Sequence, residues 1–232
     1  MNSIKIRQLF DYETWTYTYL LWCKETKQCL LIDSVIEQID RDLKLIRKIG
    51  LNLKYVLETH VHADHITGAD AIRKKMNIKI IYGSKTGVKG ADIYLDDNQL
   101  LDLGNHKIKA IHTPGHTSGC TSYYIEGYIF TGDTLFIEGT GRTDFQGGSS
   151  SDTYDSVTKK IFSFPDSTIV YPSHNYNGFT CSTIKEEKDS NPNVGLNISK
   201  EDFIDNESKK ERPYPKRFDV AVPANMNCGK VD

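Results

Sequence analysis

The sequence THVHADH at positions 59–65 constrains this chain more than any other feature, because it places three histidines and an aspartate almost side by side. The preceding run at 53–59 is apolar and β-prone, which predicts a strand, and in a strand His60 and His62 point to the same side. Asp64 and His65 follow where the pattern turns into a predicted helix over 66–76. Because imidazoles and carboxylates are disfavoured in cores but are ordinary metal ligands, this density predicts a metal site.

Residues of the same kinds recur downstream in similar settings. His116 lies in TPGHT, Asp133 in FTGD and His174 in YPSH, and each follows a strand-like run and opens a loop. Functional loops usually gather at one edge of a sheet-based scaffold, so we expect these side chains to meet there. His106 follows a turn and is expected on the surface, whereas His112 is expected behind the ligands rather than among them.

Spacing alone leaves two ligand sets open. A dinuclear zinc site would use His60, His62 and His116 for one ion, Asp64, His65 and His174 for the other, and Asp133 as a bridge around a hydroxide nucleophile. A mononuclear Fe(II) site would use only His60, His116 and Asp133. Two imidazoles and one carboxylate on one face of an octahedron leave three positions open, as oxygen insertion at sulfur requires.

The order of THVHADH, TPGHT, FTGD and a late histidine resembles the metallo-β-lactamase superfamily. The resemblance implies an αββα sandwich in a single domain over residues 1–232, with the metal at one edge of the two sheets and a loop-rich tail from about 190 to 232. Longer stretches resemble the persulfide dioxygenase branch: TPGHTSGC, FTGDTLFIEGTGRTDFQGG, IVYPSHNYNGFTCSTIKEEKDSNP and DVAVPANMNCG.

That branch implies the mononuclear iron set, with one Fe(II) per chain. It leaves four residues as hydrogen-bonding or water-holding neighbours of the ligands: His62, Asp64, His65 and His174. The implied reaction is oxidation of glutathione persulfide by dioxygen and water to sulfite and glutathione. Arg142 would bind a glutathione carboxylate or, as the resemblance favours, hold the loop beneath the iron. Tyr176 would donate a hydrogen bond near the iron or to the substrate.

Local departures bear on the alternative, a dizinc glutathione thioester hydrolase of the glyoxalase II type. Those enzymes usually carry GHTxGH, whereas this chain has Cys120 in place of the second histidine. They also add a helical C-terminal domain, and the stretch after His174 is too loop-rich for one. Thr140 stands where better-known persulfide dioxygenases often have cysteine, which puts redox regulation there in doubt but not the iron.

Composition narrows the remaining classes. A net charge of −2 gives no basic face for nucleic acid, and no apolar run reaches the length of a membrane helix. Five scattered cysteines make an odd count that favours a reducing compartment, with Cys23 and Cys29 as buried thiols. We therefore expect a cytoplasmic protein, or one of the mitochondrial matrix if eukaryotic. The resemblance adds the possibility of a homodimer.

Periodicity predicts strands first and then strands alternating with helices. Three strands are expected within 3–33, followed by a helix over 37–48 that ends at Gly50. Later elements are a strand at 78–82, short strands through 132, a helix over 152–162, a strand at 168–171 and a helix over 183–189. The basic segment 209–217 is expected to be a solvated loop, or alternatively a rim that attracts an anionic substrate.

Overall fold

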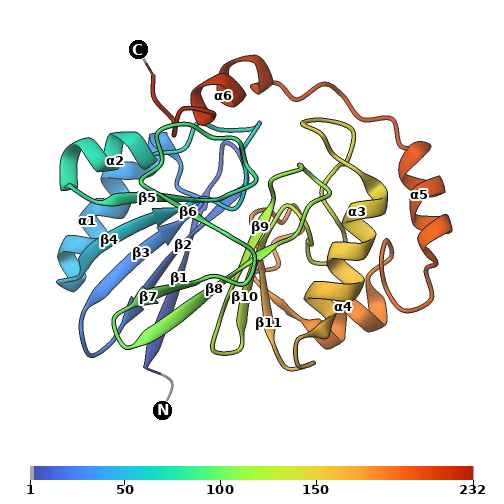
Figure 1. The fold of residues 1–232 in the computed structure, drawn as a ribbon, viewed down its shortest axis with the longest axis horizontal. Coiled ribbons are helices and arrows are strands. Elements are labelled where there is room, and N and C mark those ends of the chain that lie inside the picture. The colour runs from blue at the N-terminus through green and yellow to red at the C-terminus, as the bar shows by residue number, and fades with distance from the viewer. Residues whose placement is uncertain (1–2, 232) are drawn as a thin grey trace.

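Strand β2 (Thr16–Cys23) is buried on both faces and therefore needs a layer against each. Tyr19 and Leu21 pack in the core between the sheets, which also contains Phe130. Leu20 points the other way, into the apolar cluster beneath helix α1 (Ile39–Ile49). The computed structural model, which describes residues 3–231, accordingly has two sheets face to face with helices outside them (Figure 1).

The first sheet has six strands in the order β1-β2-β3-β4-β5-β6, and its outer face carries helices α1 and α2. Their bounds are β1 Ile4–Asp11, β2 Thr16–Cys23, β3 Gln28–Ile32, β4 Asn52–Leu57, β5 Lys79–Gly83, β6 Ile93–Leu95, α1 Ile39–Ile49 and α2 Ala69–Met76. Strands β3 to β6 run parallel, so their carboxyl ends lie at one edge of the sheet.

The second sheet has the order β12-β11-β10-β9-β8-β7, and helices α3 to α5 lie on its outer side (Figure 1). Its strands are β7 Leu100–Leu103, β8 His106–His112, β9 Thr121–Ile125, β10 Tyr128–Gly132, β11 Ile169–Pro172 and β12 Ser182–Thr183. The later helices are α3 Ser150–Asp155, α4 Ile184–Ser190, α5 Lys200–Ser208 and α6 Phe218–Asn225. The predicted αββα sandwich is confirmed.

Most predicted elements are present, with shifts at their ends. Helix α1 ends at Gly50, whose φ of 73° lets its N–H close the last turn, as predicted. Strand β4 ends at Leu57 and α2 begins at Ala69, so the histidine motif occupies a loop rather than a strand end and a helix start. The predicted helix over 152–162 is α3 followed by one π turn and one 3-10 turn. The tail expected to be loop-rich also contains α5 and α6.

The two sheets touch directly at the edge where the histidine motif lies. Thr16, at the start of β2, forms an isolated bridge with His174, just after β11. The neighbouring Tyr17 N–H donates to Ser173 O at 2.8 Å. Gly132, the last residue of β10, lies against Thr59 in the loop that follows β4 of the first sheet. The loops that follow β4, β10 and β11 therefore begin next to one another. Among residues 3–231, no helix is long and apolar enough to cross a bilayer.

The contact at Gly132 gives a test of how tightly this edge is packed. Gly132 has φ +56°, and a Cβ there would lie 2.5 Å from Thr59 Oγ1 and 2.8 Å from Thr59 Cβ. Gly127 also has positive φ, at +87°, but a Cβ there would meet nothing within 4 Å. We expect Gly127→Ala to lower the free energy of unfolding by about 1–2 kcal/mol through backbone strain alone. Gly132→Ala should lower it by about 1–3 kcal/mol more, because crowding adds to the strain.

Equilibrium urea denaturation of the two variants and the parent protein measures this difference. Equal losses for both variants would mean that the loop at Thr59 yields freely and that this edge is not tightly packed.

Candidate metal centre

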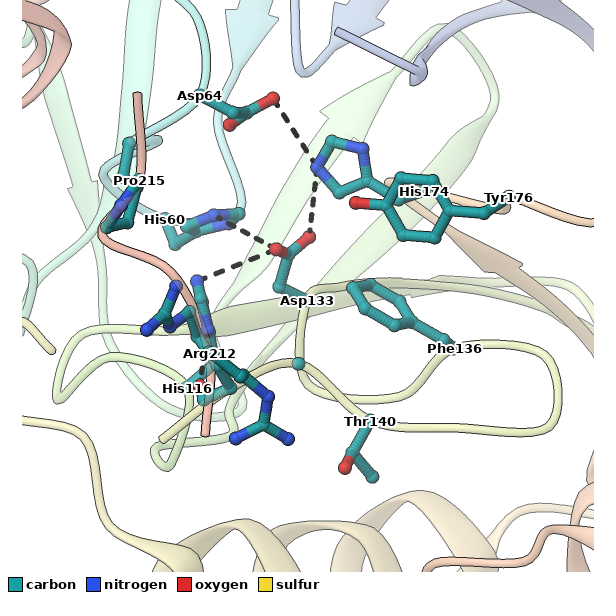
Figure 2. A pocket seen from close by; sticks show the side chains of 13 residues that line it. His60, Asp64, His116, Asp133, Phe136, Thr140, His174, Tyr176, Arg212 and Pro215 are labelled. Carbon is teal, nitrogen blue, oxygen red and sulfur yellow. Dashed lines mark hydrogen bonds and ion pairs between the residues drawn. The ribbon is translucent and has the colours of Figure 1, made fainter. Parts of the chain in front are cut away.

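A cavity of about 470 Å³ opens at the edge where the two sheets touch. Its walls come from the histidine motif, the loops after β8, β10 and β11, and the tail: His60, Ala63, Asp64, His116, Asp133, Phe136, Thr140, Gly141, Arg142, His174, Tyr176, Arg212 and Pro215. Figure 2 shows the imidazoles and carboxylates converging on its floor. The structure thus brings together the side chains that the sequence places at separate loop openings.

His60, His116 and Asp133 form a buried group whose donor atoms all lie within 4.8 Å of one another. Asp133 Oδ2 is 3.6 Å from His116 Nε2 and 3.9 Å from His60 Nε2 (Figure 2). These separations are too long for hydrogen bonds but leave space for an ion in contact with all three. Asp133 Oδ1 is buried without a hydrogen-bond partner, and His174 Nε2 lies 3.6 Å away, beyond hydrogen-bond range. A bound cation would satisfy this carboxylate, so the donor set fits a metal.

The outer nitrogens of the two histidines are already engaged. His116 Nδ1 lies 2.7 Å from the carbonyl of Arg142, which can only accept, so this nitrogen carries the proton. His60 Nδ1 lies 2.9 Å from Thr59 Oγ1, which itself donates to Asp33 Oδ2 at 2.9 Å. The hydroxyl therefore accepts from His60 Nδ1–H. Both Nε2 atoms are left deprotonated and free to bind a metal.

Electrostatics favours the neutral form of His60. Its side chain is almost fully buried, and burial together with the neighbouring His62 and His116 imidazoles lowers its pKa well below the usual value. A metal ligand must be deprotonated, so little free energy is needed to free this nitrogen.

The four residues expected to surround the ligands, His62, Asp64, His65 and His174, also lie in this cluster. His62 Nε2 lies between Glu58 Oε2 at 3.1 Å and Asp33 Oδ1 at 3.3 Å, and both carboxylates are buried. Asp64 Oδ2 lies 3.0 Å from His65 Nδ1 and 3.6 Å from His174 Nε2.

These contacts bear on both ligand sets. His62, Asp64 and His65 form a second group of possible metal donors. All seven residues of the dinuclear set are therefore present. His62 Nε2 and His65 Nδ1 are engaged with carboxylates, and the opposite nitrogens, His62 Nδ1 and His65 Nε2, are buried without a hydrogen-bond partner, so these contacts fit either ligand set.

Arg142 lines the cavity but its guanidinium is largely occupied. It forms a two-pronged ion pair with Asp144, with both N–O distances at 2.7 Å, and donates to Pro213 O at 2.9 Å. It also lies over the Phe145 ring, 4.5 Å from the centroid. These contacts fix the loop that carries the carbonyl bound to His116, in line with the loop-holding role that the resemblance favours.

Tyr176 stands at the mouth of the cavity. Its ring stacks on that of His174 at a centroid distance of 6.0 Å, and the residue is 63% exposed. Desolvation of the hydroxyl, and after it the charges of Asp133 and Asp64, raises the pKa of Tyr176. The hydroxyl therefore stays protonated and can donate a hydrogen bond to a ligand.

Sequence reasoning missed three of the lining residues: Phe136, Arg212 and Pro215. Arg212 Nη2 pairs with Glu207 Oε2 at 2.9 Å, and its side chain is 23% exposed. The signal for Arg212 was the basic segment 209–217, whose second interpretation was a rim for an anion. Phe136 and Pro215 have no signal of this kind, because apolar residues near loops are common.

Two histidine expectations were wrong. His106 is only 5% exposed, because its ring is enclosed between Glu126 and Ser3 instead of lying on the surface. His112 does not line the cavity, and its Nε2 lies 3.0 Å from Ser118 O, so it supports the loop before Cys120 and contacts none of the candidate ligands in the described contacts. Cys23, Cys29 and Cys120 are free, buried thiols, as expected for the first two.

Comparison with known proteins agrees with this geometry. A family model described as the metallo-beta-lactamase superfamily matches residues 16–174, from the start of β2 to the last histidine of the centre. The chain belongs to the metallo-beta-lactamase superfamily.

Three relatives show how far the likeness extends. The chain is 41% identical to the human mitochondrial persulfide dioxygenase ETHE1, covering 97% of this chain and 89% of the relative. The crystal structure of ETHE1 from Myxococcus xanthus has a TM-score of 0.95 and 44% identity, covering 97% of this chain and 100% of that one. A hydroxyacylglutathione hydrolase of Buchnera aphidicola is 32% identical over 84% of this chain and 74% of its own length. The family resemblance found in the sequence is confirmed.

The hydroxyl of Thr59 provides a test of how the centre is held. Thr59→Val keeps the shape of the side chain but removes the acceptor for His60 Nδ1–H. We expect the affinity for the metal to fall by about 10- to 100-fold, as is usual when a hydrogen bond that orients a ligand is lost.

Thr168→Val is the matched control, because Thr168 is equally buried and its Oγ1 has no hydrogen-bond partner. Competition with a chelator under anaerobic conditions gives the dissociation constants for Fe(II). Equal affinities for the two variants would show that Thr59 does not orient His60.

Proposed function

We propose that this chain is a glutathione persulfide dioxygenase that holds one Fe(II) through His60, His116 and Asp133. The observation that carries the proposal is the two-histidine, one-carboxylate group, found in a chain that is 41% identical to a persulfide dioxygenase over nearly its whole length. Three protein ligands on a single ion leave positions open for exogenous ligands, which is the arrangement of non-haem iron oxygenases. The substrates would be glutathione persulfide and dioxygen, and the products sulfite and glutathione.

Iron would supply the redox chemistry by which both atoms of dioxygen reach the terminal sulfur, and the chain would supply orientation. His60 and His116 keep their Nε2 atoms free because Thr59 and the Arg142 carbonyl hold the opposite nitrogens. Tyr176 is placed to donate a hydrogen bond from the mouth of the cavity. The neighbouring imidazole of His174 is fixed by the Trp15 carbonyl at 2.9 Å, so it can hold a water molecule in a defined position.

Glutathione would bind in the outer part of the cavity. A volume of about 470 Å³ lies within the usual range for sites that bind small molecules. Glutathione carries two carboxylates, and Arg212 presents a guanidinium at the wall. Arg142 is held through two nitrogens by Asp144 and through a third by Pro213 O, whereas the described contact of Arg212 is through Nη2 alone, to Glu207. We therefore assign the carboxylate contact to Arg212 and loop positioning to Arg142.

The alternative is a dizinc glutathione thioester hydrolase. All residues of the dinuclear set are present in the cluster, and a hydroxyacylglutathione hydrolase is among the relatives. Two features favour the dioxygenase. Identity to the human persulfide dioxygenase is higher and extends over more of the chain, and Cys120 stands where the hydrolases usually have histidine. A homodimer and a location in the cytoplasm or the mitochondrial matrix stay predictions.

Metal content and oxygen uptake test the function together. Anaerobic loading with Fe(II) should give about one iron per chain, and glutathione persulfide should then cause oxygen uptake with an equal amount of sulfite formed. Asp133→Asn should bind iron far more weakly and lose nearly all uptake, because the only carboxylate among the three ligands is gone. Elemental analysis, an oxygen electrode and a sulfite assay provide the readouts.

The opposite pattern would support the hydrolase. If iron-loaded protein takes up no oxygen while protein with two bound zinc ions hydrolyses a glutathione thioester, the proposal is wrong.

Arg212 gives a separate prediction on substrate binding. Arg212→Gln should raise KM for glutathione persulfide about 10-fold and leave kcat nearly unchanged, since an ion pair to a distant carboxylate contributes equally to ground and transition states. Arg217→Gln is the matched control: Arg217 belongs to the same basic segment but pairs with Glu37 and does not line the cavity. Steady-state oxygen uptake at varied substrate gives both constants, and an unchanged KM in Arg212→Gln would place the carboxylate elsewhere.

A further inference from the structure

A second cluster of metal-ligand side chains lies far from the iron site. Cys23 Sγ, a carboxylate oxygen of Glu25 and a ring nitrogen of His106 lie within 4.8 Å of one another. Cys23 is the last residue of β2 and His106 the first of β8, so the cluster joins the two sheets. Cys23 and His106 are buried, whereas Glu25 is exposed in the turn between β2 and β3.

The cluster stands at the opposite end of the sandwich from the cavity. Thr16, at the other end of β2, is hydrogen-bonded to Asp64 of the iron site. Thr16 and Cys23 are seven positions apart along the extended strand β2, which corresponds to a distance of about 23 Å. Cys23 pairs with Ile4 at the start of β1, which lies at the bottom of Figure 1, whereas α6 lies at the top. The α6 residue Asn225 donates to the His62 carbonyl of the histidine loop. The two clusters are therefore independent sites.

His106 is oriented as a metal-binding histidine would be. Its Nδ1 lies 2.6 Å from Glu126 Oε1, so a carboxylate holds one ring nitrogen. Its Nε2 lies 2.9 Å from Ser3 Oγ, a hydroxyl that a cation can displace or keep as a ligand. An imidazole with a carboxylate behind it is the usual arrangement around zinc, because the carboxylate fixes the ring and makes the nitrogen more basic.

Cys23 and Glu25 already face each other. The Cys23 thiol donates to Glu25 Oε2, with Sγ and the oxygen 3.3 Å apart. Loss of the thiol proton would leave two anionic donors side by side, which a cation bound between them would stabilise.

We propose that Cys23, Glu25 and His106 bind one zinc-class divalent cation that links the two sheets at the end remote from the iron. Thiolate, imidazole and carboxylate are the three ligand types of zinc sites, and Ser3 Oγ or water would complete a tetrahedron. On binding, the Cys23 proton is released to solvent and no electron is transferred. The proposed iron ligands, His60, His116 and Asp133, include no cysteine, whereas this cluster does. Because thiolates favour zinc, the two sites should prefer different metals.

Cobalt(II) reports on this site directly, because a cobalt–thiolate bond gives a charge-transfer band in the near ultraviolet. The protein is first loaded with Fe(II) under anaerobic conditions and then titrated with Co²⁺. We expect the band to saturate at about one cobalt per chain and to disappear when Zn²⁺ is added. Cys23→Ser should abolish it, whereas Cys181→Ser should keep it, since Cys181 is an exposed cysteine outside the cluster.

Glu25→Gln is a second test, needed because Cys23→Ser changes a buried residue and could impair folding. Glu25 is exposed, so this change should leave the fold intact and weaken cobalt binding about 10-fold. In protein already loaded with Fe(II), Zn²⁺ should also raise Tm more in the parent than in Cys23→Ser, because the parent has one more site at which a cation binds only the folded state. Absence of the band in the parent, its persistence in Cys23→Ser, or its loss in Cys181→Ser would each overturn the proposal.

Discussion

The edge that carries the metal centre depends on one buried carboxylate, that of Asp33. It is 1% exposed and follows β3 with a positive φ of 53°, and an ionised group at such a depth is costly unless it is fully paired. It accepts from Thr59 N–H at 2.8 Å and Ser173 Oγ at 2.5 Å, and lies 3.3 Å from His62 Nε2. Although burial would raise its pKa, the His62 charge and these donors lower it. The loops after β4 and β11 are thereby fixed to the same two oxygens.

The orientation of the candidate metal ligands follows from that pairing. Because Asp33 accepts from the Thr59 hydroxyl, that hydroxyl accepts from His60, and the nitrogen facing Asp133 is left bare. The same logic applies at His116, whose outer nitrogen is held by a carbonyl. This cluster has one buried carboxylate oxygen without a hydrogen-bond partner, Asp133 Oδ1, beside two imidazoles whose Nε2 atoms are unprotonated in the neutral ring. A divalent cation satisfies both at once, which is why the donor set is interpreted as a metal centre and not as a hydrogen-bonded core.

The tail completes the centre from a distance in sequence. The Asn225 side chain donates to the carbonyls of His62 and His65, each at 2.8 Å, and accepts from Thr67 N–H at 2.9 Å. It therefore satisfies three backbone groups of the histidine loop, which lies outside the strands and helices. Arg142 reaches Pro213, and Arg212 lines the cavity. The proposed substrate contact and the hydrogen bonds that hold the histidine loop thus come from the same C-terminal segment.

The sequence by itself determined the fold class and which side chains would meet at one edge of the sheets. The motif residues are adjacent in the chain or follow strand-like runs, and parallel strands end at a common edge, so local pattern sufficed for His60, His116, Asp133 and their neighbours. Helix α1 with its Gly50 cap was equally readable, because capping is a local interaction. The same patterns left the number of metal ions open, since both ligand sets use the same residues.

Only the tertiary structure decided which groups hold the donors. Asp33 and Ser173 are 140 residues apart, and no periodicity marks a pair that meets only after both sheets have formed. The place of Arg212 in the cavity wall and the burial of His106 could not be predicted for the same reason. Each depends on a contact between segments distant in the chain. The sequence gives the chemical type of each side chain directly. Its burial, its tautomer and its partners depend on which other parts of the chain pack against it.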